Sequence, residues 1–216
     1  MELKEKKVAF LGDSITFGVG ASSAETSYVG VFAKESRAQV LNFGVSGTRI
    51  ARQKTPSGNP MFDECFKDRA EKMPEDLDVV VVFGGTNDFG HGEARFGCFA
   101  DRDEYSFFGA LHALLQMLIE KYPRAYIVYM TPMHRLSEEK TVNEIGLACH
   151  PLKDYVAAIR EVCAFYSIPV VDLFAISGIQ PAVPIMQKIY MPDGLHPSDE
   201  GAARVANILL SHLRSV

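Results

Sequence analysis

The chain has 216 residues, of which 47% are hydrophobic and 23% charged, and its formal net charge is -5. This composition is typical of one globular domain, here residues 1–216, rather than of a disordered chain. The negative charge and the lack of a basic cluster exclude a phosphate-tracking surface, so we expect no nucleic-acid partner.

The opening stretch MELKEKKVAF is charged and lacks the apolar core of a signal peptide, and no later run approaches the roughly 20 residues of a membrane span. We therefore expect a cytoplasmic protein with no membrane span. The cysteines Cys65, Cys98, Cys149 and Cys163 are far apart and lack CxxC spacing. They predict neither a zinc site nor a disulfide framework.

Five short runs rich in β-branched and apolar residues predict five strands, at 7–12, 39–44, 78–85, 125–130 and 168–174. The third run, DVVVVFGG, has no polar alternation, which is typical of a strand covered on both faces. We expect it at the centre of a sheet.

Apolar residues recur at helical spacing between these runs and predict four helices. Their apolar positions are Tyr28, Val31 and Phe32; Tyr105, Phe108, Leu111, Leu115 and Leu118; Leu152, Tyr155, Val156, Ile159 and Val162; and Val205, Ile208, Leu209 and Leu213. Alternating strands and helices indicate an α/β fold with a parallel sheet, whose ligands bind at the carboxyl ends of the strands.

Three segments are longer than a minimal connection: 49–69, 89–103 and 131–151. All three follow predicted strands, so they fall at the carboxyl end of the sheet. Long segments in compact domains are commonly functional. We expect them to form the walls of a substrate pocket.

Reactive and hydrogen-bonding residues gather at the predicted strand ends. They are Asp13 and Ser14 after the first strand, Gly44 and Ser46 after the second, Asn87 and Asp88 after the third, and Asp193 and His196 before the last helix. A serine needs a base with a pKa near neutrality to become a nucleophile, and histidine is that base. The pattern predicts acyl transfer with Ser14 as nucleophile, His196 as base and Asp193 as its orienting carboxylate.

Hydrogen-bond donors for the charge that develops on an ester oxygen can also be predicted. Asn87 offers a side-chain amide, Gly44 allows close backbone approach, and the Ser14 amide lies at the start of a helix. Taken singly, these residues are ordinary caps, turns and loop residues. Their joint occurrence at the strand ends favours a hydrolytic site.

Other polar residues at the same end are candidate substrate contacts. Asp13, His91 and His134 are predicted to bind substrate, and His150 lies in the long segments together with the other two histidines. His112 and His212 lie on predicted helices and are interpreted as packing residues.

The blocks GDSIT, NFGVSG, GGTND and DGLHP, in this order, resemble the conserved blocks of the SGNH hydrolase superfamily, also called GDSL lipases and esterases. The resemblance implies a flavodoxin-like three-layer α/β/α sandwich with a five-stranded parallel sheet. It also implies an esterase or acylhydrolase that needs neither metal nor cofactor. Carried over block by block, it places the nucleophile at Ser14, the acid–base pair at Asp193 and His196, and the oxyanion donors at Ser14, Gly44 and Asn87.

Three other functions compete with this interpretation. A flavodoxin-like module could bind a phosphate or flavin after the first strand, but no GxxxxGK[ST] or well-placed GxGxxG occurs. A metal-dependent hydrolase could use Asp13, Asp88, Asp193 and His196, although HExxH is absent. An α/β-hydrolase would need GxSxG after a central strand, and GVSGT does not match it.

The substrate is predicted as a small-molecule ester, either of a short-chain acyl group or of an acylated carbohydrate. Polar loop residues suggest the carbohydrate: Asn59, Arg95, Arg102 and Arg135. The sequence does not select an acyl chain length or a preference between esters and thioesters. It is compatible with a monomer and with a homo-oligomer.

Overall fold

The computed structural model describes all 216 residues and contains one sheet of five parallel strands. The strands lie in the order β2-β1-β3-β4-β5. Their bounds are β1 (Lys7–Gly12), β2 (Gln39–Gly44), β3 (Val79–Phe83), β4 (Tyr126–Met130) and β5 (Val170–Val171). In the register, Val8 of β1 pairs with Val40 of β2 on one side and with Val79 of β3 on the other.

The five predicted strands are confirmed, and the predicted central strand is β3, which is buried along its whole length. The prediction of a seven-residue fifth strand is wrong in its length. Pro169 has no N–H to donate to a neighbouring strand, and the next helix begins at Leu173. Only Val170 and Val171 therefore pair with β4.

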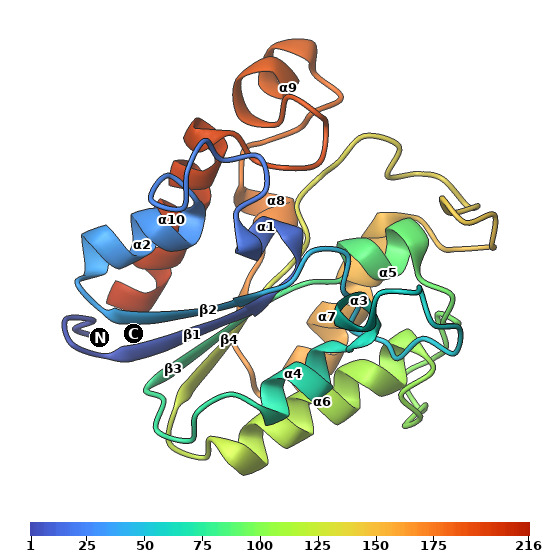
Figure 1. Cartoon of the computed structure of the whole chain (residues 1–216), viewed down its shortest axis with the longest axis horizontal. Coiled ribbons are helices and arrows are strands. Elements are labelled where there is room, and N and C mark those ends of the chain that lie inside the picture. Colours follow the sequence, from blue (N-terminus) through green and yellow to red (C-terminus); the bar gives the residue numbers. More distant parts are fainter.

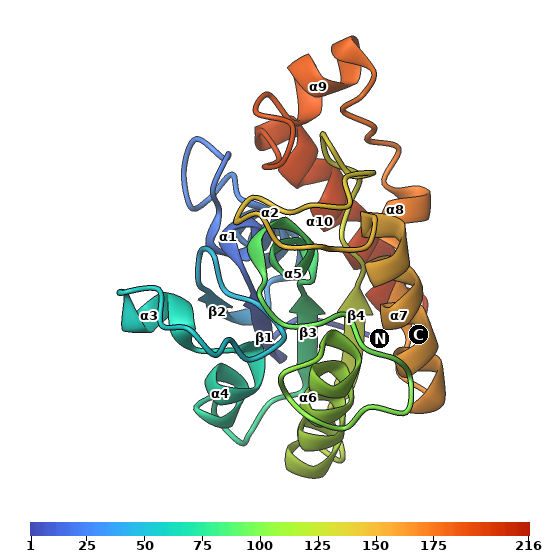
Figure 2. The same cartoon turned by 90° about the vertical axis from the view of Figure 1, so that its right-hand side faces the viewer.

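Helices cover both faces of the sheet, as Figures 1 and 2 show. On one face lie α2 (Tyr28–Ser36) and α10 (Asp199–Arg214), and on the other α4 (Phe66–Glu71), α6 (Phe107–Lys121) and α7 (Leu152–Phe165). Successive strand residues point to opposite faces, so Val8 and Phe10 join the first core while Ala9 and Leu11 join the second. The fold is the predicted flavodoxin-like α/β/α sandwich.

The four predicted long helices are α2, α6, α7 and α10. One assignment within them is wrong: Tyr105 lies outside α6 and is 41% exposed rather than part of the core face. The helix begins after Ser106, whose side chain accepts the Gly109 N–H and caps the first turn. The remaining short helices are α1 (Ser14–Phe17), α3 (Pro60–Asp63), α5 (Thr86–His91), α8 (Leu173–Ile176) and α9 (Pro184–Tyr190).

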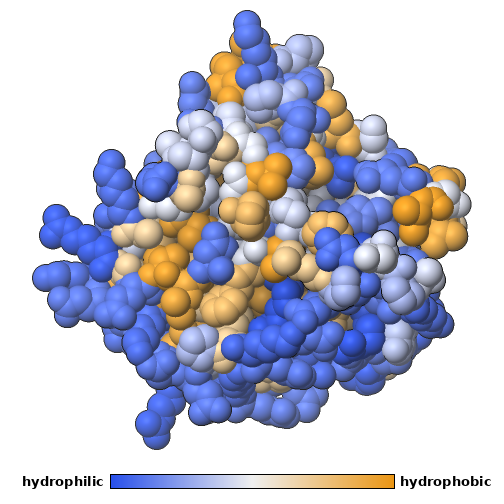
Figure 3. All heavy atoms as spheres, in the orientation of Figure 1, coloured by the Kyte–Doolittle hydropathy of each residue, from blue (hydrophilic) through white to orange (hydrophobic).

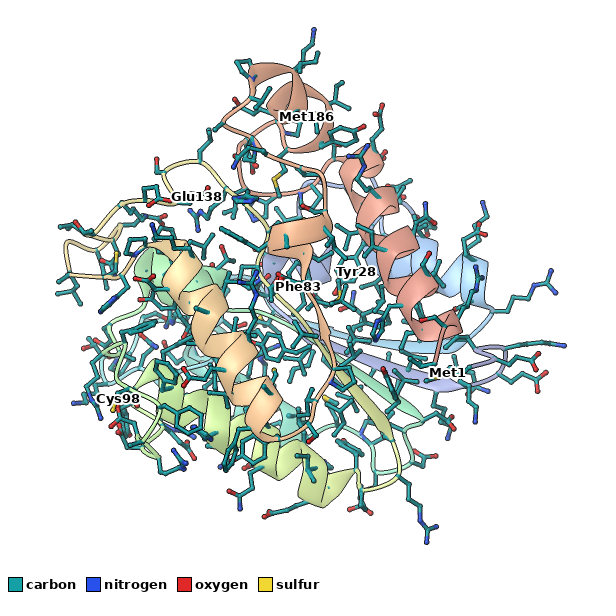
Figure 4. The ribbon with its side chains drawn as sticks, turned by 180° about the vertical axis from the view of Figure 1, so that it is seen from behind. Met1, Tyr28, Phe83, Cys98, Glu138 and Met186 are labelled. Carbon is teal, nitrogen blue, oxygen red and sulfur yellow. The ribbon has the colours of Figure 1, made fainter.

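Aromatic side chains fill the core beneath α2. Tyr28 packs edge-to-face on Phe10 and Phe83, with ring centroids 5.7 and 5.8 Å apart; Figure 4 labels Tyr28 and Phe83 close together in the interior. The Tyr28 hydroxyl is hydrogen-bonded to Thr16 Oγ1 across 2.8 Å. This contact fixes α1, the helix that begins at Ser14, on the core.

The edge strand β2 is only half-buried, and Figure 3 shows apolar side chains gathered over the area that β2 occupies in Figure 1. None of the helices combines the length and the apolar composition needed to cross a membrane.

The short helices α1 and α5 lie at the carboxyl ends of β1 and β3 (Figure 1). These two neighbouring strands flank the point where the strand order reverses direction, because the chain runs from β1 to β2 on one side and then continues from β3 on the other. Sheets of this kind bind ligands at that point.

Candidate active site

A cavity of about 310 Å³ opens at the carboxyl ends of β1 and β3. It is lined by Ser14, Val19, Ser46, Gly47, Asn87, His91, Arg135, Glu144, Leu195 and His196. We call it the active-site pocket. A larger cavity of about 860 Å³ lies between β5 and α10 and contains none of the predicted site residues.

Three of the predicted residues form a chain of hydrogen bonds at this pocket. Ser14 Oγ lies 2.9 Å from His196 Nε2, and His196 Nδ1 lies 2.7 Å from Asp193 Oδ2. With Asp193 ionised, Nδ1 carries the ring hydrogen and donates a hydrogen bond to the carboxylate. Nε2 can therefore accept a hydrogen bond from the serine hydroxyl. This geometry can move a proton from the hydroxyl to the imidazole.

The turn that carries Asp193 and His196 is held by the aspartate itself. Asp193 Oδ1 accepts the N–H groups of Leu195, across 2.9 Å, and of His196, across 2.7 Å. Partial burial raises the pKa of Asp193, but the hydrogen bonds from the His196 amide and ring outweigh it and hold that pKa below its ordinary value. The carboxylate is therefore ionised and pre-oriented at neutral pH.

Asp13 does not line the pocket. Its carboxylate is 2% exposed and accepts the Ile15 N–H across 3.0 Å, which makes it the N-cap of α1. Burial raises the pKa of Asp13 to about 6, against that hydrogen bond and the charges of Arg69 and His196. The prediction that Asp13 binds substrate finds no support in the structure, because the carboxylate faces the protein interior.

Gly44 is predicted as an oxyanion donor, but it does not line the pocket. Its N–H donates to Asn42 Oδ1 across 2.8 Å. A side chain at Gly44 would lie only 2.2 Å from the backbone nitrogen of Phe17, so β2 and α1 pack here at the closest approach that glycine allows.

Gly47, three residues further on, lines the pocket instead. Its φ angle is +76°, in the left-handed region that favours glycine, and its N–H has no acceptor in the protein. Sequence reasoning missed it, although it belongs to the same NFGVSG block as Gly44.

Asn87 does reach the pocket, from the first turn of α5. One of its amide hydrogens is donated to Thr48 O across 3.0 Å. The neighbouring Asp88 is buried and accepts the N–H groups of Ile50, across 3.0 Å, and Ala51, across 2.9 Å. Burial raises the pKa of Asp88 to about 7, against these two hydrogen bonds. The two side chains join α5 to the segment that follows Gly47.

Arg69 is a second residue that the sequence did not indicate. It lies in α4, is 5% exposed, and donates to Gly12 O across 2.9 Å, to Phe43 O across 2.6 Å and to Thr48 Oγ1 across 2.8 Å. Burial lowers its pKa to about 10, against the charge of Asp13. The guanidinium thus joins the carboxyl ends of β1 and β2 directly behind the pocket.

Of the three histidines predicted to contact substrate from the long segments, only His91 lines the pocket. His134 is hydrogen-bonded to Glu138 and packs on Phe174. His150 stacks on Phe96, with ring centroids 4.2 Å apart. The last two therefore lie outside the pocket.

Among the polar loop residues, Arg135 alone lines the pocket. Asn59 caps α3, Arg95 pairs with Asp101 and Asp103, and Arg102 donates to the backbone carbonyl of Phe99. No group of three His, Cys, Asp or Glu side chains is close enough to hold a metal ion.

Comparison with known proteins identifies the family of the chain. The family model described as GDSL-like Lipase/Acylhydrolase matches residues 10–204. A solved structure from Lactobacillus plantarum is 31% identical, with a TM-score of 0.83 over 99% of this chain and 98% of that chain. No curated protein matches the chain.

Two less similar structures share the fold. They are a possible lipase from Chitinophaga pinensis, 22% identical with a TM-score of 0.70 over 98% of each chain, and a lipase/acylhydrolase from Enterococcus faecalis, 19% identical with a TM-score of 0.66 over 97% of this chain and 96% of that chain. The family match runs from β1 to α10 and includes all four sequence blocks, so the chain belongs to the GDSL-like lipase/acylhydrolase family of SGNH hydrolases and hydrolyses ester bonds.

Proposed function

We propose that the protein is a serine esterase in which Ser14 is the nucleophile, His196 the general base and acid, and Asp193 the group that orients the imidazole. The observation that carries this proposal is the pair of hydrogen bonds, 2.9 Å and 2.7 Å long, that links the three side chains in series. Together they meet the geometric requirement for an activated nucleophile.

In the proposed reaction, Ser14 Oγ bonds to the ester carbonyl carbon while its proton passes to His196 Nε2. The tetrahedral intermediate collapses when Nε2 returns that proton to the leaving alcohol oxygen, which leaves an acyl-serine. Water then attacks the acyl carbon, with His196 accepting its proton. Transfer of that proton back to Ser14 Oγ releases the carboxylic acid and restores the hydroxyl.

The oxyanion formed in both steps is proposed to accept from three N–H groups: the backbone amides of Ser14 and Gly47 and the side-chain amide of Asn87. All three residues line the pocket. The Ser14 amide also lies at the N-terminus of α1, so the partial positive charge there acts in the same direction. Donors fixed in this way are the largest single source of rate acceleration in many hydrolases.

The lining of the pocket favours a short acyl group and a polar alcohol. Only Val19 and Leu195 among the ten lining residues are hydrophobic, and the cavity measures about 310 Å³. A long acyl chain needs an extended apolar channel to repay its burial. The charged side chains Arg135 and Glu144 instead favour polar groups.

The experiment is a panel of p-nitrophenyl esters from acetate to palmitate, measured beside acetylated sugars. We expect kcat/KM to be highest for acetate and to fall as the chain lengthens. Ser14→Ala should abolish turnover, whereas Ser211→Ala, an exposed serine of α10 away from the pocket, should not. Active Ser14→Ala protein would refute the mechanism. Loss of activity in EDTA would favour the metal-dependent hydrolase, and flavin absorbance of the purified protein would favour the flavin-binding module.

A further inference from the structure

One wall of the active-site pocket carries three polar side chains to which the proposed reaction gives no task. They are His91 at the end of α5, and Arg135 and Glu144 from the segment after β4. None of them holds the Ser14–His196 pair or the oxyanion donors by a direct hydrogen bond. Polar groups at a substrate pocket commonly fix the orientation and identity of the ligand.

His91 is held as a neutral hydrogen-bond donor. Arg49 Nη1 lies 3.1 Å from His91 Nδ1, and a guanidinium can only donate, so Nδ1 accepts and the ring hydrogen is on Nε2. Burial, assisted by the charge of Arg49, lowers the pKa of His91, so the ring stays neutral at pH 7. Nε2 has no partner in the protein, which leaves its N–H for a ligand.

Arg135 and Glu144 form an ion pair with unused hydrogen-bonding capacity. Arg135 Nη2 lies 3.0 Å and Lys140 Nζ 3.1 Å from Glu144 Oε1, while Oε2 accepts from no protein group. The Arg135 side chain is only 10% exposed, its Nη1 donates to Thr86 O and Oγ1, and its Nε is buried without an acceptor. The pair therefore presents a half-exposed carboxylate, with its Oε2 unused, next to a guanidinium that lines the same pocket.

A second cavity, of about 410 Å³, adjoins the pocket across this pair. The two cavities share Arg135, Glu144 and Leu195. Seven of the ten residues that line the second cavity are not hydrophobic, and Lys140 and Ser137 are among them. A ligand that extends past the ion pair thus enters a second polar space.

The position of the segment identifies which half of the ester meets this wall. Leu136 N donates to Gly194 O across 2.9 Å, so residues 135–144 pack on the turn that carries His196. The leaving oxygen must take its proton from His196 Nε2. The alcohol half of the ester therefore lies on this side of the pocket.

We propose that His91, Arg135 and Glu144 form an alcohol subsite that selects esters of polyhydroxylated alcohols such as sugars, an inference that rests on the proposed function. A hydroxyl group both donates and accepts. Two hydroxyls of one alcohol can accept from His91 and Arg135 while donating to Glu144. An alkyl alcohol would displace water from the same groups without replacing its hydrogen bonds, which costs binding energy.

The test compares two acetate esters that differ in the alcohol: a mono-acetylated methyl glucoside and ethyl acetate, with acid release followed by pH-stat. Glu144→Gln keeps the size of the side chain and removes its charge. The ratio of kcat/KM for the glucoside ester to that for ethyl acetate is expected to fall about 10- to 100-fold, as for lost hydrogen bonds to a charged group. Glu139→Gln is the matched control, because Glu139 is an exposed residue of the same segment that pairs with Lys153; it should keep the wild-type ratio.

Binding supplies a second readout that does not depend on turnover. Ser14→Ala protein is titrated calorimetrically with the acetylated glucoside, with and without Glu144→Gln, and the affinity is expected to fall by a similar factor. A ratio and an affinity that both stay within threefold would refute the subsite, as would a wild-type protein that hydrolyses ethyl acetate and not the glucoside ester. A wild-type protein that hydrolyses neither the p-nitrophenyl panel nor any of the acetylated sugars would refute the proposed function itself, so the two failures can be told apart.

Discussion

Asn87→Ala tests the proposed oxyanion site at a single side chain. The Asn87 amide gives one hydrogen to Thr48 O across 3.0 Å and has its second hydrogen available at the pocket. Alanine removes both hydrogens and introduces no group that could replace them. Loss of one oxyanion donor raises the barrier by about 3–4 kcal/mol, so kcat is expected to fall roughly 100- to 1000-fold.

The same substitution has a smaller effect on stability. It leaves the Thr48 carbonyl without its donor, which costs about 1–3 kcal/mol of unfolding free energy for a buried group. For a chain of this length, that corresponds to a decrease of about 2–12 °C in Tm. A loss of this size leaves a protein of ordinary stability folded at 25 °C, where kcat can be measured on the native state.

The assay is hydrolysis of p-nitrophenyl acetate at 25 °C, with circular dichroism melting to establish folding. Asn207→Ala is the control, because Asn207 lies on the solvent side of α10 beside the larger cavity and away from the active-site pocket. If folded Asn87→Ala protein keeps kcat within fivefold of wild type, the reasoning is refuted and Asn87 only supports Thr48.

Ser14→Ala and His196→Ala should each abolish turnover, and the double variant should be no slower than either one, because the members of a catalytic unit do not act additively; additive losses would show separate roles. Gly44→Ala should lower the free energy of unfolding in urea by several kcal/mol, because the new methyl would lie 2.2 Å from a backbone nitrogen of α1. Gly47→Ala, whose methyl would meet nothing nearer than 4.0 Å, should lower it by only about 1–2 kcal/mol, because of the positive φ at this position. Equal losses would contradict that distinction. Asp13 binds its proton more tightly in the folded state, with a pKa raised from 3.8 to about 6, so its contribution to stability is full below about pH 4 and is lost as the pH rises to 6. Asp13→Asn, which can still cap α1, should make the urea-unfolding free energy fall less steeply across that range, and an unchanged pH profile would argue against the raised pKa.

The sequence predicts that Ser14, Asp193 and His196 meet, and the structure brings them together, because each position is fixed by local patterns. Ser14 follows an unmistakable buried strand, and His196 sits three residues from Asp193 in a short turn. Since parallel strands share a carboxyl end, strand order alone brings such positions together. The pattern also locates Asn87, which follows β3 within four residues.

Backbone geometry and long segments are where prediction fails. Gly44 and Gly47 stand three residues apart in one block, and only the folded chain reveals that the first packs on α1 while the second reaches the pocket. Arg135 and Glu144 lie in a segment without periodic spacing, so their meeting depends on tertiary contacts. Tyr105 kept the helical spacing of α6, but the cap at Ser106 begins the helix after it.

The two buried charged residues behind the pocket, Arg69 and Asp88, share one structural role: they fix the positions of strand ends relative to one another. The proposed oxyanion donors come from three separate strand ends, and strands end where ladder hydrogen bonds stop, so little in the sheet itself fixes their relative positions. Arg69 joins the ends of β1 and β2 to Thr48, and Asp88 joins α5 to the backbone at residues 50 and 51. Burying these groups costs stability, which their shifted pKa values register. Oxyanion binding requires amides positioned to within a few tenths of an ångström, so that cost is what we expect for fixing the three proposed donors. Donors already in place need no reorganisation when charge develops.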